Sequence, residues 1–149
     1  MTILKAFKFR LYPTEEQQAA LAIQFGHARW VYNAALDLRK EMFFQNDLSL
    51  NYADCAWFLA QAKDDPNLAW LQDADSQVLQ QALLDLEKAY KRFFSLQAKG
   101  MLPKRKQPRK DRMPGGYPST KRKHDKQAIR YPQRFQFKRT AHHHFVRRG

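Results

Sequence analysis

Apolar side chains near the start of the chain, at Ile3, Phe7, Phe9 and Leu11, alternate with Lys8, Arg10 and Tyr12. A period of two is typical of a β-strand that buries one face, and the opposite face here is basic. Pro13 lacks the backbone N–H that a strand would need in order to continue. The pattern therefore predicts a strand within residues 1–13.

From residue 14 onward the apolar spacing changes to three and four residues, which is typical of amphipathic α-helices. Thr14 and Gln17 have the spacing of a capping box, so a first helix is predicted to begin there. Gly26 is expected to end this helix, and a second helix is predicted over residues 27–44.

Two more helices are predicted before the composition changes. Asn51 suits the N-cap of a third helix, which Pro66 would end. A fourth and longest helix is predicted to start near Asp75 or Ser76 and to stop at Gly100. Its expected inner face consists of Leu79, Ala82, Leu83, Leu86, Tyr90 and Phe93. Four amphipathic helices with short links predict a small helical bundle.

The two helices expected over residues 14–44 have two interpretations. Joined near a glycine, they could form a helix-turn-helix motif that binds duplex DNA, or they could be an ordinary pair of core helices. The polar face of the second helix carries three basic and two acidic side chains, so it is close to neutral. Recognition helices usually present a more basic or amide-rich face, so the pattern favours the core pair.

The positive charge of the chain is concentrated in its last third. Residues 1–98 carry 10 basic and 12 acidic side chains, whereas residues 99–149 carry 17 basic side chains and only two acidic ones. A surplus this dense is best neutralised by a polyanion, and nucleic acid binds such segments with release of counterions. An anionic membrane surface and a solvated basic tail are the alternatives.

The segment between residues 101 and 126 is dominated by Pro, Gly and basic residues, so it predicts irregular structure or disorder. Aromatic and basic residues alternate again further on, and Arg134–Lys138 is predicted to form a second strand. This strand has the character of the first, so the two are expected to pair in one sheet. The predicted fold is mainly α with flanking β, plus a basic irregular tail.

Several classes of protein and site are excluded by what the sequence lacks. A single cysteine, Cys55, rules out a disulfide framework and a cysteine-based zinc site within one chain. No apolar run approaches the ~20 residues needed to cross a bilayer, and no secretory signal precedes the first helix. The run His142-His143-His144 is interpreted as a chance tract. We expect a cytoplasmic protein without cofactor, metal site or membrane contact.

Short runs of residues along the chain carry a resemblance to a known family. They are Lys5–Phe7, Arg10–Pro13, Gly26–Asn33, Trp70-Leu71, Asp75–Leu83, Ala89–Phe94 and Tyr131–Phe135. In order and spacing they resemble the N-terminal part of the TnpB (OrfB) proteins of bacterial insertion sequences. These proteins are relatives of the type V CRISPR nucleases, and they are often described as transposases with an N-terminal helix-turn-helix.

The resemblance implies a division of the chain into four parts. Residues 1–13 would be the first strand of a wedge-like β domain, and residues 14–100 a helical recognition-type domain. A basic linker would span 101–127, and a return strand with a divergent C-terminus would span 128–149. The fold implied is therefore a helical bundle inserted between two strands of an incomplete wedge-like β domain.

The resemblance also implies an activity for full-length members, which are RNA-guided DNA endonucleases. Their nuclease half needs three carboxylates to hold divalent metal, and a zinc ribbon with paired CxxC motifs. After Gly100 this sequence contains only Asp111 and Asp125 as carboxylates, and it has no CxxC motif. We therefore expect these residues to bind nucleic acid without catalysing its cleavage.

Candidate contacts with nucleic acid fall into three groups. An RNA-facing strand surface would consist of Lys5, Lys8, Arg10 and Tyr12. By their place in the family, residues that read a motif beside the DNA target would be Tyr52, Ser76, Gln77 and Gln80. Phosphate contacts in the tail would come from Lys104, Lys106, Lys121, Lys123, Arg130 and Arg134. The three glutamines at 77, 80 and 81 are interpreted equally well as ordinary surface residues of a helix.

The expected core contains most of the large aromatic side chains, namely Trp30, Tyr32, Trp57, Trp70, Tyr90, Phe93 and Phe94. The expected partners are guide-like RNA, DNA or both, and the oligomeric state stays open. Two other functions stay open as alternatives to a TnpB-like binding portion. One is a standalone helix-turn-helix regulator of duplex DNA, and the other is a degenerate remnant without function.

Overall fold

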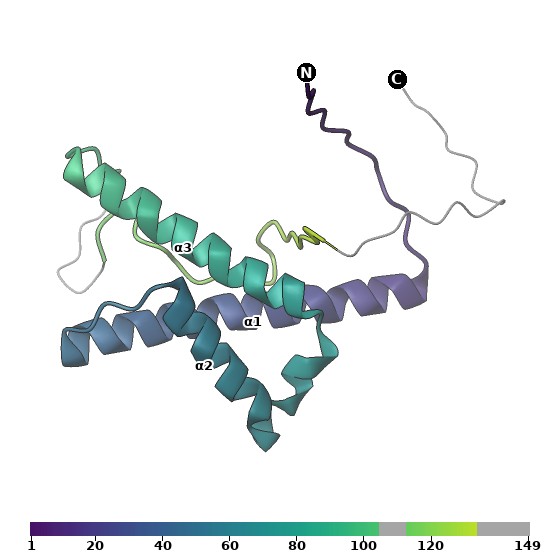
Figure 1. The fold of residues 1–149 in the computed structure, drawn as a ribbon, viewed down its shortest axis with the longest axis horizontal. Helices are drawn as coiled ribbons and strands as arrows, with labels where there is room; N and C mark the ends of the chain where they lie inside the picture. Colours follow the sequence, from purple (N-terminus) through teal and green to yellow (C-terminus); the bar gives the residue numbers. More distant parts are fainter. Residues whose placement is uncertain (105–112, 134–149) are drawn as a thin grey trace.

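The computed structural model describes residues 1–104 and 113–133. Four helices follow one another in the described part: α1 (Glu15–Asn46), α2 (Tyr52–Asp64), the 3₁₀-helix η1 (Pro66–Asp73) and α3 (Ser76–Ala98). Figure 1 shows α3 lying across α1, with α2 and η1 packed below the two longer helices. None of these helices combines the length and apolarity that crossing a membrane requires.

The capping box predicted at Thr14 and the N-cap predicted at Asn51 are confirmed. The Thr14 hydroxyl accepts a hydrogen bond from the Gln17 backbone at 3.3 Å, and the Gln17 side chain accepts one from the Thr14 N–H at 2.9 Å. Asn51 and Asp54 make the same reciprocal pair at the start of α2. Each box satisfies N–H groups that have no partner inside the helix, which fixes where the helix begins.

The predicted break at Gly26 is wrong, because α1 is a single helix of 32 residues that passes through this glycine. A glycine inside a helix costs about 1 kcal/mol relative to alanine, which packing of the helix can offset. The helix ends instead at Asn46, and the left-handed backbone of the C-cap residue Asp47 (φ 52°) turns the chain so that the Leu48 N–H bonds back to the Met42 carbonyl at 3.1 Å. Residues 15–46 therefore form one helix in the structure, where the sequence predicted two.

The core lies where α1, α2, η1 and α3 meet. Every residue predicted for the inner face of α3 is buried, from Leu79 to Phe93. Leu36 of α1 and Leu71 of η1 are completely buried against this face. These side chains supply the apolar surface that holds the helices together.

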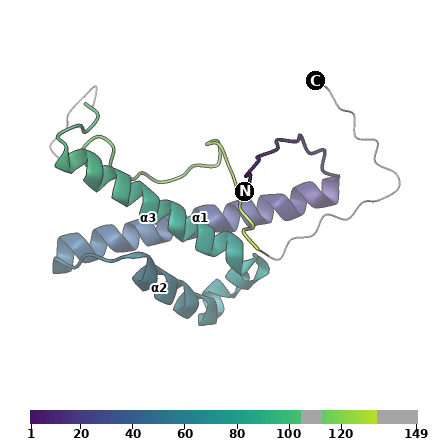
Figure 2. The ribbon, with the colours of Figure 1, turned by 45° about the horizontal axis from the view of Figure 1, so that its top comes forward.

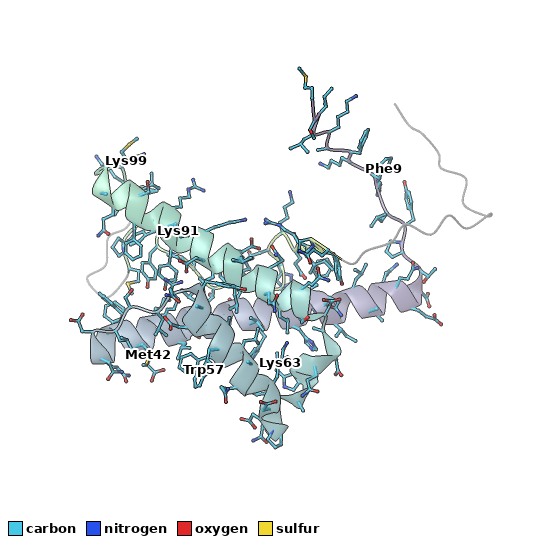
Figure 3. All side chains as sticks on the ribbon, in the orientation of Figure 1. Phe9, Met42, Trp57, Lys63, Lys91 and Lys99 are labelled. Atoms are coloured by element: carbon cyan, nitrogen blue, oxygen red, sulfur yellow. The ribbon has the colours of Figure 1, made fainter. Side chains whose placement is uncertain are left out.

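The prediction for the aromatic residues is partly wrong. Tyr32, Tyr90 and Phe93 are buried, and the two tryptophans at positions 30 and 70 are half-buried with their rings edge to face. Trp57 and Phe94, however, are 59% and 51% exposed. Trp57 comes two residues after buried Cys55, so it lies on the opposite face of α2 and points away from the helices (Figure 3).

The predicted flanking β structure is also wrong for the part of the chain that the structure describes, which contains no strand. Residues 1–13, which we call the arm, are extended (Figure 1), and within residues 1–104 and 113–133 no second strand pairs with them. An alternating pattern needs such a partner before it can form a sheet and bury its apolar face. The predicted return strand, Arg134–Lys138, lies outside the described residues, and the wedge-like domain is not formed by residues 1–104 and 113–133.

Residues 117–133, which we call the strap, are irregular, as the sequence predicts for most of this segment. The strap runs beside α3 in the direction opposite to that helix and also contacts α1 (Figures 1 and 2). Residues 102 to 104 lie close to its beginning, because Gly115 packs directly against the Pro103 carbonyl group. The strap is thus a second layer over one side of the two long helices.

Candidate nucleic-acid interface

Tyr117 anchors the beginning of the strap. Its hydroxyl lies 2.9 Å from the hydroxyl of Tyr90, and its ring packs edge-on against the rings of Tyr90 and Phe93 at 5.5 and 5.1 Å. Burial, together with the hydrogen bond to Tyr117, raises the pKa of Tyr90. The Lys40 ammonium of α1 lies 5.7 Å from the centre of the Tyr117 ring. Both long helices therefore contact this one side chain.

A buried ion pair lies beneath this anchor. The Arg39 guanidinium of α1 is 2.7 Å from the Glu87 carboxylate of α3, and both side chains are largely buried. The same guanidinium stacks over the Tyr90 ring at 3.8 Å. Because Arg39 is paired inside the protein, it is a structural residue and is not available to a nucleic acid.

Asn33 holds the middle of the strap by its main chain. The Asn33 side-chain oxygen accepts a hydrogen bond from the Lys121 N–H at 2.8 Å, and its side-chain nitrogen donates to the Lys121 carbonyl at 3.0 Å. This paired contact places the Lys121 ammonium 4.4 Å from the centre of the Tyr32 ring. A cation over an aromatic face is stabilised by the ring quadrupole, so the direction of the lysine side chain is fixed as well.

The end of the strap contacts the first turns of α3. Arg130 lies 3.4 Å from Asp85, and the Gln133 N–H donates to the Gln77 side-chain oxygen at 3.1 Å. Gln77 was predicted to read bases, yet its amide oxygen is already bound by the strap. Use of this glutamine for base recognition would require the end of the strap to move.

The arm residues predicted to face RNA are all exposed. Lys5, Lys8, Arg10 and Tyr12 lie on the extended segment that leaves the start of α1 and points away from the helices (Figures 1 and 3). The Arg10 guanidinium lies 5.4 Å from the centre of the Tyr12 ring. The structure does not bring these four residues together with the other predicted groups.

The residues predicted to read a target-adjacent motif are only partly brought together. Ser76, Gln77 and Gln80 share the first turns of α3, and Gln80 lines an open groove of about 360 Å³ between α3 and α2. The rest of the groove is lined by Ala56, Leu59, Ala60, Lys63, Asp64 and Gln72. Tyr52 instead packs against the core and is half-buried.

The predicted tail residues divide into three groups. Lys104, Lys121 and Lys123 are exposed, although the position of Lys121 is fixed by Asn33. Arg130 is exposed and paired with Asp85. Lys106 and Arg134 lie outside the described residues.

Sequence reasoning missed the residues that hold the strap in place. Asn33 was named only as the end of the run Gly26–Asn33, and Tyr117 was not among the predicted candidates. Their partners lie 88 and 27 residues away in the sequence. A single sequence gives no signal for such pairs.

Comparison with known proteins connects this geometry to a family. Residues 1–47, which contain the arm and α1, match the family of IS605 OrfB proteins described as a helix-turn-helix domain. The chain is 35% identical over 108 residues to the virulence protein VsdF of Salmonella dublin and covers 91% of that protein. It is also 34% identical over 133 residues to InsQ of Escherichia coli K12, which is named as an RNA-guided DNA endonuclease. The chain belongs to the TnpB/OrfB family.

A second relative named as an RNA-guided DNA endonuclease comes from Streptomyces pristinaespiralis and is 36% identical over 115 residues. The chain spans 28% and 29% of the length of this protein and of InsQ. It therefore corresponds to the nucleic-acid-binding N-terminal portion of a TnpB-like protein. Within the part matched to the helix-turn-helix description, the structure contains the single helix α1.

Proposed function

We propose that this N-terminal portion of a TnpB-like protein binds a guide-like RNA along the strap and the arm, in the cytoplasm. The observation that carries the proposal is the docking of a basic segment on two rigid helices. Asn33 and Tyr90 fix the path of the strap, so Lys121, Lys123 and Arg130 are presented at set positions. Cations on a docked segment bind a phosphate backbone better than the same cations on a free tail would, because the docked segment loses less conformational entropy on binding.

The arm is proposed as a second RNA contact. Its aromatic side chains are exposed, and Arg10 already lies over the Tyr12 ring. Unpaired bases stack on aromatic rings and guanidinium planes, and each stacked base contributes about 1–3 kcal/mol. A duplex offers few unstacked bases, so this surface favours single-stranded RNA.

The start of α3 is proposed as the surface that distinguishes DNA sequences. Ser76 and Gln80 are exposed there, and Gln80 borders the groove between α2 and α3. A glutamine amide matches the donor and acceptor edge of adenine. Gln77 would join this surface once Gln133 releases its side chain, and Tyr52 would support the groove wall from the core.

Recovery of RNA with the purified chain tests the proposal directly. We expect a discrete RNA to co-purify with the chain and to bind it more tightly than an unrelated RNA does in a competition assay. A DNA duplex without guide RNA should bind more weakly than the recovered RNA.

Deletion of residues 101–149 should flatten the salt dependence of binding, because about one unit of log–log slope is lost per phosphate contact. The Gln80→Ala variant should relax DNA sequence discrimination without changing that slope. Equal affinity and slope for the full and deleted chains would contradict the role of the strap.

A further inference from the structure

The strap encloses a small hollow between itself, α1 and α3. The hollow has a volume of about 40 Å³ and lies beside Val78–Asp85 of α3. Its cationic side chains are Arg29, Lys121, Arg122, Lys126 and Arg130. Only two carboxylates, Asp85 and Asp125, line it as well, so its net charge is +3.

The two carboxylates leave part of this positive charge unpaired. Asp85 lies 3.4 Å from Arg130, and Asp125 lies 4.0 Å from Arg122. Lys121 lies over the Tyr32 ring. Within residues 1–104 and 113–133, Arg29 and Lys126 make no ion pair. These two cations line a concave surface without a protein anion to neutralise them, which favours an external one.

We infer that the hollow binds one phosphate group of a nucleic-acid backbone, with Arg29 and Lys126 as its main ligands. This inference rests on the proposed function and names a contact that the sequence did not predict. The planar guanidinium of Arg29 can donate two parallel hydrogen bonds to phosphate oxygens, and the Lys126 ammonium adds a point charge. Arg29 is on a long helix and Lys126 is on the strap, so one phosphate joins two layers of the protein.

Phosphate binding and docking of the strap are coupled through Asn33. The hollow exists only while the strap lies on α1, and Asn33 holds the strap there through the Lys121 peptide groups. A ligand that binds only the docked form stabilises that form, and loss of docking weakens the ligand by the same factor. Removing the Asn33 amide should therefore weaken phosphate binding although no charge is changed.

The test compares neutralised cations inside and outside the hollow in the full chain. Affinity for a short labelled single-stranded RNA is measured by fluorescence anisotropy at several salt concentrations. Arg29→Gln and Lys126→Gln should each weaken binding by about 5- to 10-fold and lower the salt slope by about one unit. Lys99→Gln is the matched control, because Lys99 lies at the opposite end of α3 from the hollow (Figure 3). Equal losses in all three variants would overturn the inference, since only total charge would then matter.

The substitution Asn33→Ala adds a test in which no charge is changed. Alanine favours a helix, so α1 should keep its structure, which circular dichroism verifies. We expect a loss of affinity of about 5-fold, comparable to the loss in Arg29→Gln. Wild-type affinity in a folded Asn33→Ala variant would show that the hollow does not need the docked strap, and the inference would fail.

Two further measurements are needed. One distinguishes a free phosphate ion from an RNA phosphate as the ligand, and the other distinguishes failure of the hollow from failure of the proposed function. Inorganic phosphate is titrated while the Arg29 side-chain Nε–H signal is followed by NMR, and RNA should then displace it. Tight phosphate binding that RNA cannot displace would mark a small-anion site and overturn the inference. Absence of RNA binding by the wild-type chain would contradict the proposed function itself. RNA binding by the wild type with hollow variants equal to Lys99→Gln would contradict only the hollow.

Discussion

The arm and the strap are two basic, aromatic segments with opposite relations to the helices. The arm carries a clear alternating pattern, yet Phe7 and Leu11 are 75% and 79% exposed and the segment points away from α1. The strap has no periodic pattern, yet Tyr117 contacts Tyr90 and Phe93, and Lys121 is held by Asn33. A regular alternation of apolar and polar residues therefore did not determine which of the two segments packs against α1 and α3.

The difference lies in what the helices offer to each segment. Along α1 and α3 the strap meets an Asn amide, a Tyr hydroxyl and a carboxylate, each placed opposite a group it can bind. The arm is joined to α1 where the Gln18 amide donates to the Pro13 carbonyl at 3.2 Å. A strand needs another strand to satisfy its backbone groups, and the described residues contain none. We propose that both segments contact nucleic acid through their charge, but only the strap makes complementary contacts that give it a fixed path.

The largest effect is expected from the buried pair beneath the strap. Glu87→Ala leaves the Arg39 guanidinium buried without its carboxylate, so the free energy of unfolding should fall by about 3 kcal/mol. Replacing both residues, as in Arg39→Met with Glu87→Leu, should cost clearly less. Urea denaturation measures both variants. An equal loss in the single and double variants would mean that the pair contributes through packing and not through charge.

A smaller effect is expected at the anchor of the strap. Tyr117→Ala removes the ring contacts with Tyr90 and Phe93, so docking of the strap should weaken by about 2 kcal/mol. Tyr117→Phe removes only the hydroxyl and should cost about 1 kcal/mol. Hydrogen exchange of the strap amides measures both changes, and protection in α3 serves as the internal reference. Unchanged exchange in Tyr117→Ala would show that the strap is held without this anchor.

The substitution Gly26→Ala tests whether the arm and the strap are attached to one continuous helix, α1. A Cβ at this position would have open space, with the Arg29 guanidinium as its nearest neighbour at 3.9 Å. Gly26→Ala should therefore raise the free energy of unfolding by up to about 1 kcal/mol, because alanine favours the helix. Thermal denaturation measures the change. Destabilisation would indicate a turn at Gly26 and restore the interpretation of two helices.

The smallest effect is expected from removing the arm. Deletion of residues 1–12 keeps the Thr14 cap, so unfolding of the helices should change by less than about 0.5 kcal/mol. Affinity for single-stranded RNA should nevertheless fall, because the exposed aromatic and basic side chains are lost. A large loss of stability in the same denaturation assay would show that the arm packs on the helices as the strap does.

Local signals predicted the local features of this fold. The caps at Thr14 and Asn51 and the buried face of α3 depend on neighbours within a few residues, and these predictions are confirmed. The break at Gly26 was wrong because burial further along α1 outweighs a modest helix penalty. The strand was wrong because its pattern describes a preference and does not supply a partner.

The candidate site depended on contacts that sequence spacing does not reveal. Lys121 and Arg130 were chosen for their charge alone, and the structure adds the partners that fix them. Arg29 was set aside as part of a nearly neutral helix face, although it lines the hollow with Lys126. The distribution of charge along the chain predicted nucleic acid as the ligand, whereas the proposed positions of its contacts depend on the fold.

The contact between Asn33 and residue 121 has a consequence for how this surface can change in evolution. Asn33 binds the peptide N–H and carbonyl of residue 121 and not its side chain. Any residue except proline can supply both groups, so substitution at position 121 leaves the route of the strap intact. The positions of basic side chains along the strap can thus change while the hydrogen bonds from Asn33 to the main chain of residue 121 are kept. Relatives that keep the Asn could diverge in the nucleic acids they prefer without rebuilding the fold.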